Sequence, residues 1–121
     1  MRGMSLAAAA VVLVLTAPAL LAQEIYTPGP GVSEPAVVSQ VRAEYTEAAK
    51  AQRIQGEVVL EVVVLADGSV GDVVVTDSLD TKYGLDQQAV NAIHQWTFKP
   101  GIKDGKPVAV RIMIVARFSL T

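Results

Sequence analysis

The stretch that most constrains the fold is IQGEVVLEVVVLADGSVGDVVVTDSLD, residues 54–80, in which two short apolar runs surround one Asp-Gly pair. Side chains alternate between the two faces of a β-strand, so an alternating pattern predicts a strand with one buried face. The residues expected on the buried face of the first strand are Val58, Leu60, Val62 and Val64. Asp67-Gly68 favours the positive φ angles of a tight hairpin turn. The stretch therefore predicts an antiparallel β-hairpin.

The second strand of this hairpin follows the turn. Its apolar residues are Val70, Val73 and Val75, and Gly71 is the expected position of a β-bulge. Glu57 and Glu61 alternate with the buried residues of the first strand, so we expect them on its solvent face. None of these carboxylates needs a catalytic role.

Two amphipathic helices are expected on either side of the hairpin, because apolar residues recur there at three- and four-residue spacing. The first begins at Val38, ends before Gly56 and has the apolar stripe Val38, Val41, Tyr45, Ala48 and Ala49. The second has the stripe Leu85, Ala89, Ile93 and Trp96. Asp86 lies in its first turn, where the helix dipole favours an anion, and Lys99-Pro100-Gly101 ends it.

A long strand is expected after a small turn at residues 103–106. Apolar and mixed residues alternate from Val108 to Leu120, which is longer than the usual strand of about 5–6 residues, so we expect part of it to extend beyond its neighbours. The simplest burial of these apolar faces is an α+β fold with two helices on one face of a three-stranded antiparallel sheet, in the order α-β-β-α-β. Tyr45, Trp96 and Phe118 are the expected core anchors.

The N-terminal residues 1–22 predict a secretory signal peptide. Arg2 precedes an apolar run from Leu6 to Leu15, and small residues follow. Cleavage after Ala22 is favoured over cleavage after Ala19, and an uncleaved membrane anchor is the alternative. The chain has no cysteine to which a lipid anchor could be attached.

The remaining chain divides into two parts. Residues 23–37 are rich in proline and glycine and predict a linker or extended arm, whose first fourteen residues reach at most about 50 Å. Residues 38–121 predict a single domain.

Composition and residue types argue against several functions. The 10 basic and 12 acidic residues form no like-charge block, so a nucleic-acid partner is not expected. The absence of cysteine excludes disulfides and thiolate metal sites. His94 is the only histidine and lies on the polar side of the second predicted helix, so we expect a solvated residue. Asp67, Ser69 and Asp72 begin like a calcium loop, but no glutamate closes it. We therefore expect no enzymatic activity, cofactor, metal site or small-molecule substrate.

Several motifs occur in a fixed order along residues 38–121. They are Tyr45-Thr46-Glu47-Ala48-Ala49 with Ile54-Gln55-Gly56, Val62-Val63-Val64 with Asp67-Gly68 and Val70, Leu85-Asp86 with Ala89-Val90 and Ala92, Trp96-Thr97-Phe98-Lys99-Pro100-Gly101, and Gly105-Lys106-Pro107-Val108. In this combination the chain resembles the TonB C-terminal domain family. One departure is Thr46, because many members have proline after the tyrosine.

The resemblance implies a periplasmic binding domain that adds the N-terminal peptide of an outer-membrane transporter to its sheet as a strand. It also implies that full-length members carry a membrane anchor, which couples to a motor, and a long proline-rich spacer. The predicted signal peptide and the short linker of this chain depart from that pattern. We therefore expect the binding domain without energy transduction by this chain alone.

The expected binding site is the backbone of the last predicted strand. If this strand pairs with the first strand of the hairpin, one of its edges stays open beside Ile112 and Ile114, and an extended peptide can satisfy its hydrogen-bonding groups. The partner-binding residues are Arg111, Ile112, Met113, Ile114, Val115 and Arg117.

The side chains expected to face away from the helices are Arg111, Met113, Val115 and Arg117. Met113 suits varied apolar partners, and the two arginines either bind acidic groups of a peptide or protect the edge from aggregation. An alternative function uses the same edge in a structural or adaptor domain. Such a domain would bind other envelope proteins, or form a homodimer through strand exchange.

Overall fold

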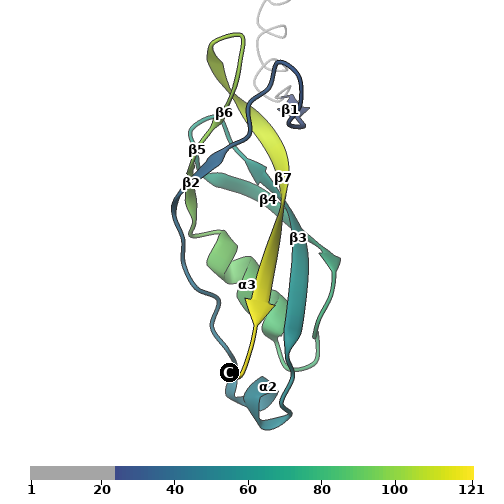
Figure 1. Cartoon of the computed structure of the whole chain (residues 1–121). Coiled ribbons are helices and arrows are strands. Elements are labelled where there is room, and N and C mark those ends of the chain that lie inside the picture. Colours follow the sequence, from purple (N-terminus) through teal and green to yellow (C-terminus); the bar gives the residue numbers. More distant parts are fainter. Residues whose placement is uncertain (1–23) are drawn as a thin grey trace, which may run out of the picture.

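The computed structural model describes residues 24–121, so the predicted signal peptide, residues 1–22, lies outside the described part (Figure 1). In chain order the elements are β1 (Ile25–Tyr26), β2 (Ala36–Ser39), α2 (Glu47–Ala51), β3 (Gly56–Val64), β4 (Val70–Asp77), α3 (Leu85–Ile93), β5 (Thr97–Lys99), β6 (Gly101–Lys103) and β7 (Lys106–Phe118). Among residues 24–121, no helix has the length and hydropathy that a membrane span requires.

Three long antiparallel strands form the centre of the main sheet. β3 lies in the middle, with β4 on one side and β7 on the other. β3 and β7 pair without interruption from Gly56–Phe118 to Val64–Val110. The predicted hairpin is confirmed as β3 and β4, and the turn at Asp67-Gly68 contains a hydrogen bond from Ser69 N to Asp67 Oδ1 of 2.9 Å.

The predicted three-stranded antiparallel sheet is wrong, because the main sheet has five strands and is mixed. β1 pairs with β7 in parallel, and β6 pairs with β7 in antiparallel fashion. β2 and β5 form a separate two-stranded sheet. The physical reason is that β7 extends four residues, 106–109, beyond its pairing with β3. This extension offers backbone partners to short segments that have no periodicity of their own.

The first predicted helix is wrong in its extent, because α2 covers only Glu47–Ala51 and residues 36–39 are strand β2. The helix begins after Thr46, whose Oγ1 accepts a hydrogen bond from Ala49 N (3.1 Å) and donates one to Tyr83 O (2.7 Å). Between β2 and Thr46 the chain has no regular secondary structure, and Val41 O accepts a hydrogen bond from Trp96 Nε1 (2.8 Å). The spacing of the apolar residues therefore reflects these separate contacts rather than one helical stripe.

The second predicted helix is confirmed as α3, although it ends at Ile93, before Trp96. Its N-cap position is Gly84, which has no side chain, and the Asp80 carboxylate instead satisfies one of the free N–H groups at the start of the helix. Asp80 Oδ2 accepts a hydrogen bond from Leu85 N (3.1 Å). Asp86 Oδ1 accepts hydrogen bonds from the backbone N–H groups of Leu79 (3.0 Å) and Asp80 (2.9 Å), and its Oδ2 accepts one from Ser78 Oγ.

These contacts also set the acidity of Asp86, which is buried. Burial raises the pKa of its carboxyl, but the hydrogen bonds from Asp80, Ser78 and Leu79 outweigh this effect and hold the pKa below its ordinary value. The carboxylate is therefore a structural group at the start of α3.

The core lies between the main sheet and the helices. Its fully buried members are Ala49, Val58, Leu60, Val62, Leu85, Ala89, Ile93 and Phe118. All four residues predicted for the inner face of β3 are buried. Of the three predicted anchors, Phe118 is buried, whereas Tyr45 and Trp96 are half-buried and pack against this cluster. The rings of Tyr45 and Phe118 meet edge to face with centroids 5.4 Å apart.

Candidate functional site

Part of the edge of β7 that faces away from β3 has backbone N–H and C=O groups without a strand partner among residues 24–121. β1 and β3 flank β7, and Val110 has a partner on each side, Tyr26 and Val64. From Arg111 to Phe118, within residues 24–121, strand pairing is found only on the β3 side. We call the other side of Arg111–Phe118 the open edge. It includes the backbone beside Ile112 and Ile114, where the sequence predicts an uncovered border.

The side chains along the open edge alternate between two environments. Ile112, Ile114 and Ala116 are half-buried against the core. Met113 and Val115 point to the opposite face, which the helices do not cover, and are 54% and 53% exposed. This alternation places Arg111, Met113, Val115 and Arg117 on the outer face, as the sequence predicts.

The two arginines of the outer face form ion pairs with β3. Arg117 Nη2 lies 2.8 Å from Glu57 Oε2, and Arg111 Nε lies 3.1 Å from Glu61 Oε1. The Arg111 contact is an ion pair without a well-directed hydrogen bond, because its buried Nε–H does not point at the carboxylate. Exposed pairs of this kind contribute about 0–1 kcal/mol. A peptide carboxylate would therefore compete with Glu57 and Glu61 for these guanidinium groups.

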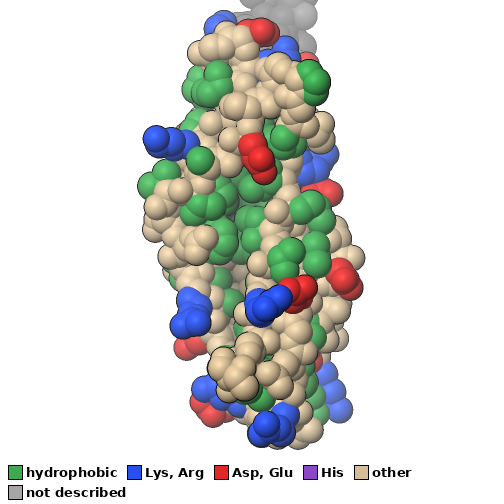
Figure 2. Space-filling view, in the orientation of Figure 1, with side chains coloured by type: hydrophobic (Ala, Val, Ile, Leu, Met, Phe, Trp, Pro, Cys, Tyr) green, Lys and Arg blue, Asp and Glu red, His purple; other side chains and the backbone are tan. Residues whose placement is uncertain are grey.

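A hollow in the surface accompanies the open edge. Figure 2 shows hydrophobic side chains gathered in the middle of this face, in a depression beside β7. Apolar surface next to free backbone groups is suited to an extended segment whose alternate side chains point into the sheet. The hollow and the outer face thus provide apolar contacts on both sides of an added strand.

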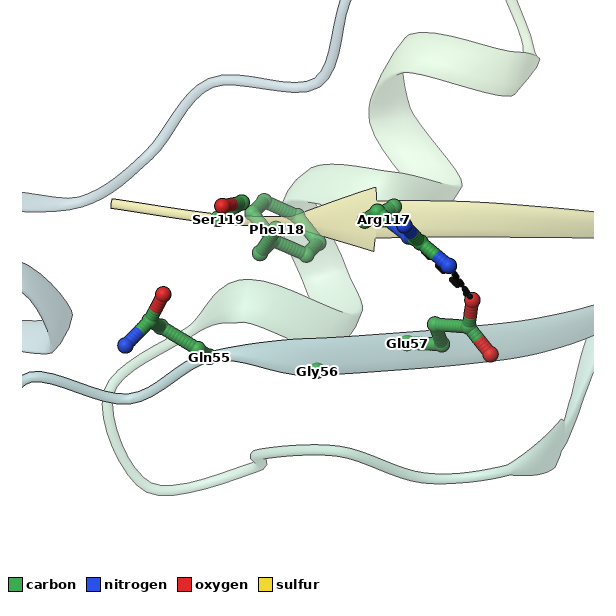
Figure 3. A pocket seen from close by; sticks show the side chains of 6 residues that line it. All are labelled: Gln55, Gly56, Glu57, Arg117, Phe118 and Ser119. Carbon is green, nitrogen blue, oxygen red and sulfur yellow. Dashed lines mark hydrogen bonds and ion pairs between the residues drawn. The ribbon is translucent and has the colours of Figure 1, made fainter. Parts of the chain in front are cut away.

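A second, shallow pocket lies where β3 begins and β7 ends (Figure 3). It is lined by Gln55, Gly56, Glu57, Arg117, Phe118 and Ser119. Its charged groups are the Glu57–Arg117 ion pair, and Gln55 Oε1 accepts a hydrogen bond from Leu120 N of 3.0 Å. The one hydroxyl group of this lining, on Ser119, has only Thr121 as a hydrogen-bond partner among residues 24–121.

The outer edge of β4 is the other border of the main sheet, but it is less regular than β7. Two register shifts interrupt its pairing with β3, between Val59 and Leu60 and between Val62 and Val64. Gly71, the predicted bulge position, lies within the second shift, where Gly71 and Asp72 stand opposite the single residue Val63, so the predicted irregularity is confirmed. Bulges turn an edge away from further pairing, so β7 offers the better template for an added strand.

His94 and Asp67, which the sequence analysis weighed as catalytic or calcium-binding residues, lie in surroundings that give them no such role. His94 is exposed at the C-terminal end of α3. Asp67 accepts hydrogen bonds from Ser69 Oγ (2.6 Å) and Ser69 N (2.9 Å), and the hydroxyl contact, followed by the backbone one, lowers the pKa of this carboxyl. Within residues 24–121, His, Cys, Asp and Glu side chains form no group of three that could hold a metal ion.

Comparison with known proteins assigns the family. The sequence model described as Gram-negative bacterial TonB protein C-terminal matches residues 41–120. The chain belongs to this family. The TonB C-terminal domain thus includes both helices and the strands from β3 to β7, whereas β1 and β2 lie upstream of the match.

This TonB domain is similar to one curated protein and to one solved structure. Protein TonB of Vibrio cholerae is 43% identical over 90 residues, which are 74% of this chain and 36% of that protein. The chain therefore spans about a third of the length of this curated relative. The solution NMR structure of the Pseudomonas aeruginosa TonB C-terminal domain matches with a TM-score of 0.55 and 24% identity, over 74% of this chain and 91% of that one. This second likeness shows the fold.

Sequence reasoning missed one functional neighbour of the open edge, the strand β1. Its signal is weak, because Ile25 and Tyr26 are two strand-favouring residues between Glu24 and Pro28. Two residues cannot show a period, so this strand follows only from its contact with β7.

Proposed function

We propose that this domain is a non-enzymatic periplasmic module that captures an extended peptide by adding it as a strand to the open edge of β7. The peptide is an N-terminal segment of an outer-membrane transporter, and capture serves TonB-dependent transport. The observation that carries the proposal is the regular edge of Arg111–Phe118, without a strand partner among residues 24–121.

The energetics of such an edge favour a peptide of moderate affinity. Every second residue of an edge strand directs its N–H and C=O outward, so eight residues of β7 offer roughly eight hydrogen bonds. Each contributes only about 1 kcal/mol net, and ordering the peptide opposes this gain. Specificity must therefore come from the peptide side chains that contact Met113 and Val115 on the outer face and the hollow on the other face.

A titration with a synthetic peptide from a transporter N-terminus tests the proposal. We expect the amide signals of residues 111–118 to shift most, because the peptide pairs with them. Shifts concentrated on residues 70–77 would place the peptide on β4 and contradict the proposal.

A matched pair of variants sharpens this test. Met113 and Val74 are both cross-strand partners of Glu61, and they are 54% and 55% exposed. They therefore lie on the same face, but only Met113 borders the open edge. We expect Met113→Glu to weaken peptide binding about fivefold, or about 1 kcal/mol, and Val74→Glu to leave it within twofold.

Self-association is the second candidate function, because the same open edge and the exposed Met113 and Val115 suit a second copy of this chain. Sedimentation separates the two candidates. A dimer that persists at all concentrations, with its β7 strands paired, would leave no edge for a transporter peptide. A monomer at micromolar concentration supports peptide capture.

A further inference from the structure

Strand β1 lies on the same side of β7 as the open edge and immediately before it. Ile25 pairs with Ala109 and Tyr26 pairs with Val110, and both pairs are parallel. The next residue of β7, Arg111, begins the open edge. The arm of the chain therefore occupies the part of this side of β7 that immediately precedes the open edge.

The arm is anchored downstream of β1 by contacts that do not involve the open edge. Ser33 N donates a hydrogen bond to Ile102 O (3.0 Å), and Ile102 N donates one to Ser33 Oγ (2.8 Å). Further along, β2 pairs with β5. These contacts keep the arm on the domain even when β1 leaves β7.

Strand β1 itself is held by few contacts. It has two residues, and Ile25 is 40% exposed. The aromatic ring of Tyr26 adds a cation–π contact with Lys103 Nζ, which lies 5.5 Å from the ring centroid. A short tether to Ser33 gives β1 a local concentration on the order of millimolar, so a weak strand can still compete with a soluble peptide.

We propose that β1 sets the length of the peptide that the domain accepts. With β1 in place, an added strand is confined to Arg111–Phe118, and a longer one pairs with Ala109 and Val110 only after it displaces Ile25 and Tyr26. This inference rests on the proposed function, because it concerns the same edge. Its consequence is that extending a peptide beyond the open edge adds no affinity until β1 is released.

The test uses the whole chain and two synthetic peptides from one transporter N-terminus. The short peptide has eight residues, and the long peptide extends it by three residues at each end. The variant Ile25→Pro/Tyr26→Pro removes the N–H donors of β1. The control Glu34→Pro places a proline at an exposed arm position outside β1 and β2.

We expect the double proline variant to bind the long peptide about tenfold more tightly than the unmodified chain does, as the loss of a competing pair of strand residues predicts. The short peptide should bind all three proteins equally, and Glu34→Pro should behave as the unmodified chain. In the peptide-free proteins, the Ala109–Val110 segment of β7, which pairs with β1, should lose protection from hydrogen exchange only in the double proline variant.

Two results would overturn the inference in different ways. If both peptides bind and the double proline variant shows no gain for the long one, β1 does not limit the peptide, and the proposed function stands. If neither peptide binds any of the three proteins, the proposed function fails, and the inference fails with it.

Discussion

Replacing Gly68 by alanine tests how the β3–β4 hairpin is attached to the rest of the domain. Gly68 has a φ angle of +88° in the Asp67-Gly68 turn. A Cβ atom at this position would lie 2.1 Å from the backbone O of Phe98. Gly68 O also accepts a hydrogen bond from Phe98 N of 2.9 Å. The tip of the hairpin is therefore in direct backbone contact with β5.

The expected loss in the free energy of unfolding of Gly68→Ala is the sum of two effects. Alanine in the left-handed region costs about 1 kcal/mol. Relief of the 2.1 Å contact requires the turn and β5 to separate, which breaks the hydrogen bond to Gly68 and leaves the N–H of Phe98, a buried residue, unpaired. An unsatisfied buried donor costs about 1–3 kcal/mol. We therefore expect Gly68→Ala to lower the free energy of unfolding by about 3 kcal/mol.

Gly105→Ala is the matched control, because Gly105 also follows an aspartate in a tight turn and has a φ angle of +77°. A Cβ atom at Gly105 would meet nothing within 4 Å, so only the left-handed strain of about 1 kcal/mol applies. Urea denaturation followed by circular dichroism measures both changes. For a domain of this size the melting temperatures should fall by about 12–24 °C and 4–8 °C. Equal losses in the two variants would refute the reasoning about the Gly68–Phe98 contact.

Three further changes give expected outcomes. Trp96→Phe removes the indole N–H that bonds Val41 O, so the free energy of unfolding should fall by about 1–2 kcal/mol in urea denaturation; an unchanged value would show that this bond does not hold the segment before α2. Asp86→Asn should lower the free energy of unfolding at pH 7. The difference in this free energy from the unmodified protein should become smaller as the pH falls below about 4. The reason is that a carboxyl whose pKa is lowered in the folded state stabilises the fold above its unfolded pKa, and this stabilisation is lost when the carboxyl is protonated. Asp72→Asn, at an exposed position, is the control, and a gap that stays constant between pH 7 and pH 3 would contradict the role of the carboxylate. Arg117→Ala should change the free energy of unfolding by less than about 1 kcal/mol, since its pair with Glu57 is exposed; a larger loss would show that the ion pair determines the β3–β7 register.

The long elements of this fold could be predicted from the sequence. β4, most of β7, and β3 as far as Val62 alternate between more and less buried side chains, and that pattern persists over enough residues to specify a strand and its inner face. α3 carries its stripe over its nine residues and has an acidic residue in its first turn. These elements are specified locally, because each must bury one face whatever its partners are.

The short elements could not be predicted, because their partners stabilise them. β1, β5 and β6 have two or three residues each, which is too few for any period. The apolar residues between Val38 and Tyr45 have helical spacing, yet the chain there is strand β2 up to Ser39 and then has no regular secondary structure as far as the Thr46 cap. Contacts with β5 and Trp96 outweigh the local preference of that segment.

In the candidate site, too, some features could be predicted from the sequence and others could not. Alternation along β7 was sufficient to separate Met113 and Val115 from Ile112 and Ile114, because neighbouring side chains of a strand must face opposite sides. The partners of Arg111 and Arg117 were not predictable, because the β3–β7 register alone brings Glu61 and Glu57 beside them.

By itself, the sequence determined the family, through motifs that follow one another along the domain. It also determined the hairpin, the helix α3 and the two faces of the last strand, since these depend on residues that are near one another in the chain. Only the tertiary structure decided which edge of β7 stays open and how far β1 covers it. Backbone N–H and C=O groups are the same in every residue, so no sequence pattern records which of them find a partner. That choice is made when distant segments meet across the sheet.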